Sequence, residues 1–194
     1  METIRTFIAI PLPDALLKRL SALQERLETE VPHRSMRWVK PTGIHLTLKF
    51  LGDISTERLP EIKQALTAVA QNAPACQFTV GELGCFPNPS RPRVLWVGVQ
   101  EPSGRLNALQ DAIEEALDTL GYAREKRGFT PHLTLGRVQR KVSHNAATRI
   151  GDVVQATPVE QLAHITAEHF ALIRSDLKPT GAAYTTLATF DLKR

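Results

Sequence analysis

The sequence predicts two similar lobes, each built from strands and helices, that face each other across one cleft. Two observations support this prediction. The tetrapeptide His-Leu-Thr-Leu occurs twice, at 45–48 and 132–135, so that its histidines lie 87 residues apart. The same order of elements (strand, helix, His-Leu-Thr-Leu strand, helix, strand) can be traced around each copy. We interpret the repetition as a duplication whose two units are related by a pseudo-two-fold axis.

In the first half, apolar runs bounded by turn residues predict strands at 6–10, 45–51 and 77–83. Aliphatic residues at helical spacing predict one helix after Asp14 and another after Ser55. These two side chains are expected to cap the helices, because short polar side chains accept hydrogen bonds from free N–H groups of a first turn. We expect Gly52-Asp53 to end the second strand and 86–92, rich in proline, to form a loop.

The second half repeats this order. Its expected strands are 93–99, 132–138, 163–174 and 182–190. Ser103 is expected to cap a helix that Gly121 stops, and a weaker helical pattern follows at 146–154. The repeated order therefore places each His-Leu-Thr-Leu strand in an equivalent position.

Composition and charge narrow the class of protein. The chain has 194 residues, 42% hydrophobic and 23% charged, which is typical of a globular protein, and no apolar run or signal-peptide pattern predicts a membrane span or secretion. We interpret Cys76 and Cys85 as reduced thiols of a cytoplasmic protein. The net charge is +4, and short groups of Arg and Lys lie near both tetrapeptides. They form either a basic field that attracts a phosphorylated ligand or an ordinary solvated surface.

The tetrapeptides carry the chemistry. In a strand, residues two apart share a face, so each His lies beside its Thr while both leucines face the core. Two histidines across a cleft can supply one base and one acid near neutral pH, and threonine hydroxyls can donate to phosphate oxygens. Neither copy brings a carboxylate or cysteine at metal-ligand spacing, so we expect no metal. The residues alone leave open which histidine is the acid.

Four stretches resemble one known family: RTFIAIPLPD, RWVKPTGIHLTLKFLGD, FPNPSRPRVLWVGV and GFTPHLTLGRV. They are similar to the 2H phosphoesterase superfamily, specifically to the RNA 2′,3′-cyclic phosphodiesterases, also called 2′-5′ RNA ligase-like proteins. The resemblance runs from Arg5 to at least Val138. It implies a single bilobal α+β domain over 1–194, with an antiparallel sheet in each lobe, helices on its outer face and a central cleft.

The resemblance also implies an activity. The expected reaction is hydrolysis of a terminal 2′,3′-cyclic phosphate, on RNA or oligonucleotide ends, to a 2′-phosphomonoester without metal or other cofactor. On the family pattern, His45 is the proton donor to the 3′ oxygen and His132 the proton acceptor that activates water. Thr47, Thr134 and Arg137 are expected to bind the phosphate.

The sequence leaves open on which face of the strand the side chains near the two motifs lie. Arg137 lies five residues after its histidine, so an ideal strand would turn it to the opposite face, and a bulge or the strand end must redirect it. Lys49, four residues after its histidine, either reaches the phosphate or extends into solvent. Phe50 and Phe129 are at odd offsets and are expected in the core. Phe7 and Trp38 are candidates for stacking on a nucleobase, although core packing is the favoured interpretation for both residues.

Two alternatives remain beside hydrolysis. One is 2′-5′ RNA ligation, the reverse reaction at the same site. The other is a module that holds phosphorylated RNA ends without turnover, which would need the threonines and basic groups but no pair of histidines. We expect the protein to act as a monomer.

Overall fold

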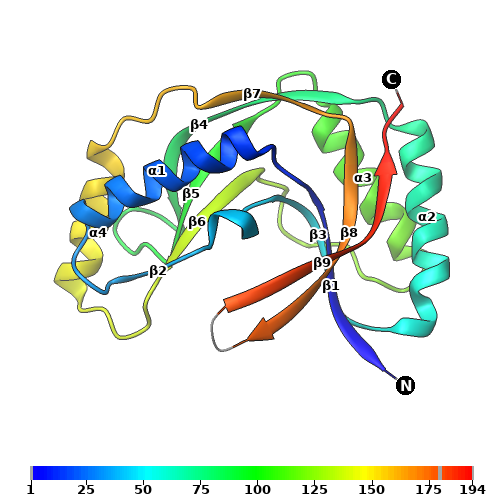
Figure 1. The fold of residues 1–194 in the computed structure, drawn as a ribbon, viewed down its shortest axis with the longest axis horizontal. Coiled ribbons are helices and arrows are strands. Elements are labelled where there is room, and N and C mark those ends of the chain that lie inside the picture. The colour runs from blue at the N-terminus through cyan, green and yellow to red at the C-terminus, as the bar shows by residue number, and fades with distance from the viewer. Residues whose placement is uncertain (1, 179–180, 194) are drawn as a thin grey trace.

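The fold is built on two antiparallel sheets (Figure 1). The computed structural model describes residues 2–178 and 181–193. One sheet has four strands in the order β3-β1-β8-β9, with bounds Leu46–Ser55, Thr3–Ile10, His169–Lys178 and Gly181–Asp191. The other has five strands in the order β2-β6-β5-β4-β7, with bounds Met36–Trp38, His132–Val138, Val94–Gln100, Cys76–Phe86 and Ala163–Ala167.

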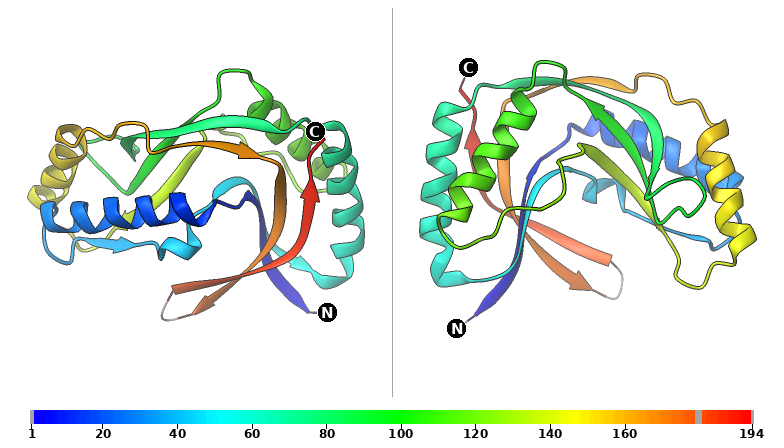
Figure 2. Two further views of the ribbon diagram at one scale, coloured as in Figure 1. Left: turned by 45° about the horizontal axis from the view of Figure 1, so that its top comes forward. Right: turned by 180° about the vertical axis from the view of Figure 1, so that it is seen from behind.

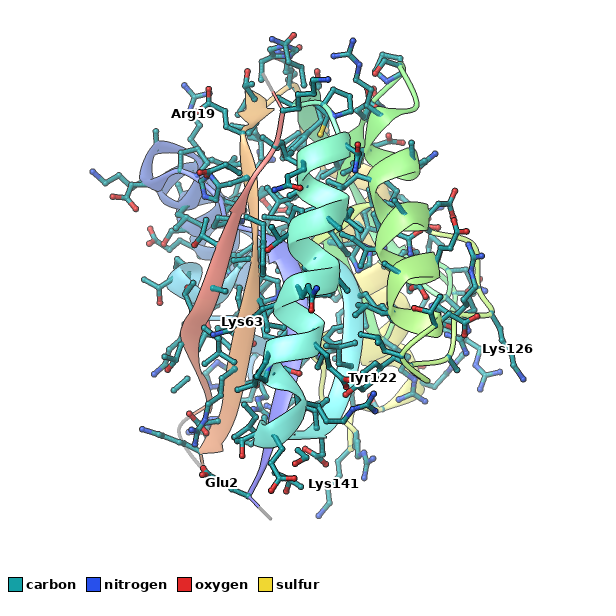
Figure 3. The ribbon with its side chains drawn as sticks, turned by 90° about the vertical axis from the view of Figure 1, so that its right-hand side faces the viewer. Glu2, Arg19, Lys63, Tyr122, Lys126 and Lys141 are labelled. Carbon is teal, nitrogen blue, oxygen red and sulfur yellow. The ribbon has the colours of Figure 1, made fainter. Side chains whose placement is uncertain are left out.

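Helices cover the outer face of each sheet. They are α1 (Asp14–Glu30), α2 (Leu59–Asn72), α3 (Arg105–Asp118) and α4 (His144–Ala156). Helices α2 and α3 pack side by side over the four-stranded sheet, as Figure 3 shows. Helices α1 and α4 lie at the opposite flank with the five-stranded sheet (Figure 1, Figure 2). The expected two-lobed α+β fold is confirmed. Across the described part of the chain, no helix is both long and apolar enough to span a membrane.

Apolar residues at helical spacing attach the helices to the sheets. The inward stripe of α1 consists of Leu16, Leu20, Leu23 and Leu27, and that of α3 of Leu106, Leu109, Ile113 and Leu117, all buried. Fully burying one such side chain stabilises the fold by about 1.5–3 kcal/mol. The helices thereby hold the sheets from outside and leave the inner faces for the cleft.

The duplicated units exchange elements between the lobes. Strand β1 pairs with β3 of its own half and with β8 of the second half. In the same way β5 pairs with β6 of its own half and with β4 of the first half. The helix after each of these strands crosses over as well: α1 packs with the five-stranded sheet and α3 with the four-stranded one. The lobes are therefore not the two halves of the sequence, and neither lobe is complete without both.

Two strand predictions were wrong in their bounds. The run 163–174 is not one strand: it breaks at Glu168 into β7, in the five-stranded sheet, and β8, in the four-stranded sheet. The apolar pattern continues through this crossing, so periodicity alone gave no signal for it. Gly52-Asp53 does not end β3, which runs on to Ser55, because Gly52 takes a φ of +72° where the pairing with β1 shifts.

Two of the three side chains expected to cap helices, Asp14 and Ser103, do not do so. Ser55 does accept a hydrogen bond from the N–H of Glu57, in the 3-10 turn (Thr56–Arg58) that leads into α2. Asp14 is inside the first turn of α1, after Pro13 at the cap, where its negative charge interacts favourably with the positive end of the helix dipole. Ser103 does not cap α3, because the carboxylate of Glu101 accepts hydrogen bonds from the backbone N–H groups of Ser103 and Leu106 instead.

Candidate active site

The two lobes share a cleft of about 510 Å³. It is lined by residues of β1, β2, β3, β6, β8 and β9, which places both sheets on its walls. Four of the five residues expected at the site line it: His45, Thr47, Thr134 and Arg137. His132 is the first residue of β6, two positions before Thr134 and therefore on the same strand face.

His45 lies immediately before β3 among aromatic rings. Its imidazole stacks on Phe7 at 4.5 Å between ring centroids, and Tyr184 meets it edge-on at 5.3 Å. Burial lowers the pKa of His45 from 6.5 to about 4, while a hydrogen bond to the backbone of Gly43, two residues earlier, opposes that shift. His45 is therefore a neutral imidazole at neutral pH.

His132 is oriented by a hydrogen bond to the backbone. Its Nδ1 lies 2.7 Å from the carbonyl oxygen of Thr130, again two residues earlier in the chain. A carbonyl only accepts, so Nδ1 carries the proton and Nε2 of the neutral ring is free to take one. Phe86 meets the ring edge-on at 4.9 Å and fixes its plane.

Strand β3 contains a β-bulge just after its histidine and threonine. Ile8 of β1 is opposite Lys49, and the next residue, Ala9, is opposite Thr47. Leu48 is therefore an extra residue with no partner of its own on β1. One extra residue reverses the alternation of side chains beyond it.

Strand β6 contains the same bulge at the same position. Leu95 of β5 is opposite Gly136, and the next residue, Trp96, is opposite Thr134, which leaves Leu135 as the extra residue. Because the repeat spacing is 87 residues, Leu135 is the counterpart of Leu48. The duplication has kept both the motif and the irregularity that follows it.

The bulges decide where the following residues point. Arg137 lines the cleft despite its odd offset, so the bulge required by the sequence interpretation is present. Its counterpart in β3 is Phe50, which also lines the cleft and is 66% exposed. The preceding residues, Lys49 in β3 and Gly136 in β6, are buried and do not line the cleft. A side chain at Gly136 would meet the ring of Trp38 at 2.9 Å from its Cβ, which explains the glycine.

Both interpretations of Lys49 were wrong, as was the core assignment of Phe50. The Lys49 ammonium is buried in an ion pair with Glu114 (2.5 Å) and donates to the carbonyl oxygen of Ala123 (2.9 Å). The core packing favoured for Phe7 is confirmed, because that ring is buried beneath His45.

The two remaining aromatic candidates are partly buried. Phe129 packs against the core, in agreement with its expected place. Trp38 also packs there while lining the cleft, so its ring is divided between the two environments.

Comparison with known proteins identifies the family. The model of the LigT-like phosphoesterases matches the chain twice, over residues 10–96 and 97–184. The chain belongs to the LigT-like phosphoesterases. The two matches divide the sequence where the duplication predicts, with one His-Leu-Thr-Leu motif in each.

Several relatives are similar to this chain over nearly its whole length. An Archaeoglobus fulgidus protein named RNA 2′,3′-cyclic phosphodiesterase is 32% identical over 188 residues, covering 97% of this chain and 100% of that protein. One of the same name from Thermotoga maritima is also 32% identical, covering 95% and 93% of the two chains. Among solved structures, TT0787 of Thermus thermophilus has a TM-score of 0.80 at 27% identity, covering 97% of this chain and 98% of that one. E. coli LigT complexed with 3′-AMP has a TM-score of 0.79 at 25% identity, with both chains fully covered.

Further basic residues line the cleft of this LigT-like phosphoesterase together with Arg137. Arg37 and Lys40 belong to the basic groups that the sequence indicated as a field for a phosphorylated ligand, whereas Arg5 was missed, and no carboxylate is among the described lining residues. Tyr184 comes from the last hairpin. Burial raises its pKa, with Arg137 and Arg5 acting in the opposite direction, so these cations lie near the ring. The basic groups around 37–40 were a visible signal, but nothing local linked Arg5 or the last hairpin to the motifs.

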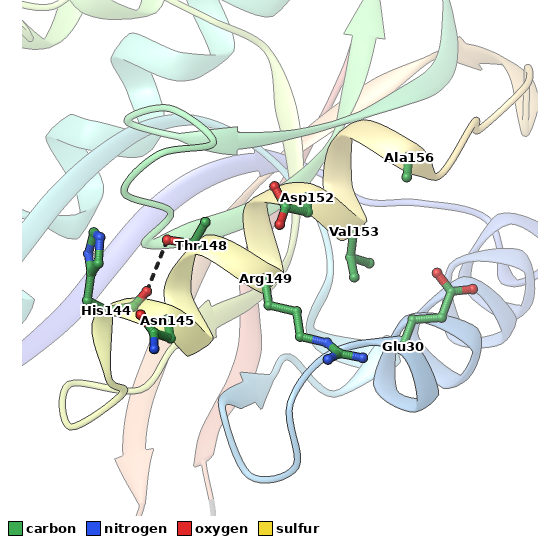
Figure 4. Close-up of a pocket in the computed structure, with 8 residues that line it drawn as sticks. All are labelled: Glu30, His144, Asn145, Thr148, Arg149, Asp152, Val153 and Ala156. Atoms are coloured by element: carbon green, nitrogen blue, oxygen red, sulfur yellow. Dashed lines mark hydrogen bonds between the residues drawn. The ribbon is translucent and has the colours of Figure 1, made fainter.

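A second hollow of the phosphoesterase, about 740 Å³, lies elsewhere, along α4 with Glu30 of α1 at its edge (Figure 4). None of the residues expected at the site line it. Within the described ranges, no three His, Cys, Asp or Glu side chains cluster closely enough to form a metal site.

Proposed function

We propose that this chain is an RNA 2′,3′-cyclic phosphodiesterase, which hydrolyses a terminal cyclic phosphate to a 2′-phosphomonoester. The observation that carries the proposal is the pair of His-Leu-Thr-Leu strands, one from each sheet, at one cation-lined cleft. The names of full-length relatives at about 30% identity support it.

The two histidines divide the proton transfers. His132 is the proton acceptor: Nδ1–H is held by the Thr130 carbonyl, so Nε2 takes a proton from water as its oxygen bonds to phosphorus. The bond from phosphorus to the 3′ oxygen breaks, and His45 donates a proton to that oxygen. One water is consumed, and no electrons are exchanged.

Three side chains hold the phosphate. Thr47 and Thr134 donate hydroxyl hydrogen bonds to its non-bridging oxygens, and Arg137 adds a charge-assisted contact. These donors face the charge that develops as water attacks, which stabilises the transition state. The mechanism needs no metal or other cofactor.

His45 must gain its proton with the substrate. With a pKa of about 4 in the free enzyme, its imidazole is neutral at neutral pH. An anionic phosphate placed beside the ring favours the charged form and raises that pKa. Substrate binding thus charges the acid, while the hydrogen bond at Gly43 stabilises the protonated ring.

The partner is RNA or an oligonucleotide ending in a cyclic phosphate. Arg5, Arg37 and Lys40 provide positive charge around the cleft beyond what one phosphate needs. We also propose that the protein acts as a monomer, because one chain carries every group that the mechanism uses. A cytoplasmic location is also part of it, supported by the free, buried thiols of Cys76 and Cys85.

The test is turnover of a 2′,3′-cyclic mononucleotide and of a cyclic-ended oligonucleotide in EDTA, with products separated by chromatography. We expect the 2′-phosphomonoester from both, at rates that chelation leaves unchanged. Formation of the 3′ isomer, or activity restored only by added zinc or manganese, would contradict the mechanism. Binding without turnover would favour the RNA-end-binding module, and joining of added 5′-hydroxyl ends would show ligation at the same site.

A further inference from the structure

Each helix that crosses between the lobes carries a buried glutamine in the same sequence setting. Helix α1 reads LSALQERL over 20–27, and α3 reads LNALQDAI over 106–113. Gln24 and Gln110 occupy the same place in these stretches, 86 residues apart, close to the 87-residue spacing of the histidines. Both side chains are buried in otherwise apolar stripes. A buried amide costs free energy unless it is hydrogen-bonded, so its partners indicate its role.

Both glutamines donate to the backbone of a β-bulge. The Gln24 amide lies 2.8 Å from the carbonyl oxygen of Leu135, and the Gln110 amide lies 3.5 Å from that of Leu48. Leu135 and Leu48 are the extra residues of the bulges in β6 and β3. A bulge interrupts the regular ladder, so a hydrogen bond to its extra residue constrains backbone that strand pairing constrains less. Each helix thus holds the motif strand of the other half of the sequence.

The Gln24 contact is the shorter of the two and joins two parts of the cleft wall. The same amide also donates to the carbonyl oxygen of Val39 at 2.8 Å, and the Val39 N–H donates to the Leu135 carbonyl at 2.9 Å. Val39 lies two residues after Arg37, and Leu135 lies two residues before Arg137. Both arginines line the cleft. Gln24 therefore fastens together the two backbone segments that carry these cations.

The Gln110 contact is longer, and β3 has a second anchor. Gln110 also donates to Oε1 of Glu114 at 3.1 Å, and Oε2 of the same carboxylate accepts from the Lys49 ammonium. Helix α3 thus holds the β3 bulge through a buried ion pair as well as through its glutamine. In the second copy Gly136 stands at the position of Lys49 and can form no such pair. The β6 bulge therefore depends more strongly on Gln24.

We propose that Gln24 and Gln110 are positioning residues that hold the two bulges, and that Gln24 thereby directs Arg137 toward the phosphate. This rests on the proposed function, in which Arg137 binds the phosphate. The bulge decides on which strand face Arg137 lies, and a binding side chain is effective only when its supporting hydrogen bonds fix its direction. Gln24 is not among the described lining residues of the cleft, so it acts through the strand and not on the ligand.

The test begins with phosphate binding, measured by calorimetry and independent of turnover. Gln24→Met keeps the length of the side chain and removes its donor. It should weaken inorganic phosphate by about 3- to 10-fold, the factor that corresponds to one neutral hydrogen bond. Leu20→Val, in the same buried stripe of α1, is the matched control for lost packing and should bind phosphate within about 2-fold of the wild type.

The Arg137→Ala background shows whether Gln24 acts through the arginine. There, Gln24→Met should weaken phosphate by no more than about 2-fold, because the side chain that it positions has been removed. Gln110→Met should weaken phosphate less than Gln24→Met does in the intact protein, since Phe50 and not a cation follows its bulge.

Amide hydrogen exchange tests the bulge without any ligand. The Val39 N–H shares the Leu135 carbonyl with Gln24, so local opening at this point should become easier when the glutamine is lost. Measured against the amides of β1, in the other sheet, Val39 should exchange faster in Gln24→Met than in Leu20→Val.

The outcomes distinguish this positioning from the reaction itself. Wild-type phosphate affinity in Gln24→Met, or the same loss with and without Arg137, would overturn the role of Gln24 even in an enzyme that hydrolyses cyclic phosphates. An unchanged exchange rate at Val39 would overturn the anchoring of the bulge. Coupled losses together with faster exchange, in a protein without turnover, would uphold the positioning and reject the proposed function.

Discussion

Strands β3 and β6 carry the same tetrapeptide, and their differences are more informative than their likeness. Both histidines bond to the backbone two residues earlier, at Gly43 and Thr130. Both strands bulge at the second leucine of the motif. The shared geometry places His45, Thr47 and Thr134 at the lining of one cleft, with His132 two residues before Thr134 on the same strand, which a symmetric duplication can do on its own.

Catalysis of hydrolysis needs an acid unlike the base, and the surroundings of the motifs provide the difference. His45 is buried among Phe7 and Tyr184, whereas His132 meets Phe86 edge-on at the start of its strand. After the bulges, Phe50 stands where Arg137 stands in the other strand. We propose that the duplicated framework positions the reacting groups and that divergence outside the tetrapeptide distinguishes their roles.

The largest expected effect comes from removing either histidine. His45→Ala and His132→Ala should each lower kcat by about 10² to 10⁴, the usual contribution of one general acid or base. The double variant should be little worse than either single variant, because the two groups act in one step. Steady-state rates on a 2′,3′-cyclic nucleotide provide the measurement.

A substrate with a better leaving group than the 3′ oxygen separates the two roles. It should rescue His45→Ala, which lacks the acid, and leave His132→Ala impaired. Rescue of the other variant would reverse the assignment, and near wild-type turnover in both would refute the paired mechanism.

The second largest effect is on the free energy of unfolding and concerns Lys49, the residue after the bulge in β3, and its partner Glu114. Glu114→Ala leaves the Lys49 ammonium buried without its partner, which typically costs about 3–5 kcal/mol. It also removes the acceptor for Gln110 and for the N–H of Glu125. Urea unfolding of Glu114→Ala, compared with the pair Lys49→Met and Glu114→Leu, tests this. The paired variant should recover much of the loss, and equal losses in both would argue against an unpaired charge as the cause.

How much the sequence could predict follows from these same positions. Alternation within a strand placed His45 with Thr47 and His132 with Thr134 correctly, because the period holds within each tetrapeptide. It failed beyond Leu48 and Leu135, since these bulges are set by how β3 and β6 pair with β1 and β5, which the sequence of one strand does not show. Only Arg137 gave a warning, through the conflict between its expected role and its offset.

Contacts between distant segments account for the rest. The exchange of β4 and β8 between the lobes leaves no periodic signal, and neither does the crossing at Glu168. Tyr184 reaches His45 from the last hairpin, 139 positions along the chain. Local patterns therefore predicted the elements and the motifs, while the walls of the cleft depended on tertiary structure.

The third prediction uses the environment of His45. The pKa of His45 is about 4 in the folded protein and about 6.5 for an ordinary, solvent-exposed histidine, so below pH 6.5 the unfolded chain binds a proton that the folded chain does not bind. Stability should therefore fall as the pH decreases from 6.5 to 4, by about 3 kcal/mol from this residue. Urea unfolding of the wild type and His45→Gln over this range isolates the contribution, because the other histidines cancel in the difference. Parallel pH curves for the two proteins would contradict the burial of His45 as the cause.

The smallest expected effect tests the comparison of the two strands directly. Arg137→Phe places in β6 the residue that β3 carries at the equivalent position, and so removes a charged hydrogen bond to phosphate, worth about 1.5–3 kcal/mol. Inorganic phosphate and adenosine 2′-monophosphate should both bind about 10- to 150-fold more weakly. The reciprocal variant, Phe50→Arg, gives the four-stranded wall a cation beside His45 and should bind inorganic phosphate at least as well as the wild type. It should nevertheless turn over more slowly, since a positive charge near the ring lowers its pKa further and disfavours the protonated acid. Calorimetry with both ligands, together with kcat on the cyclic mononucleotide, distinguishes the two positions. If Arg137→Phe and Phe50→Arg changed phosphate affinity in the same direction, the two walls would not differ in the way their residues indicate.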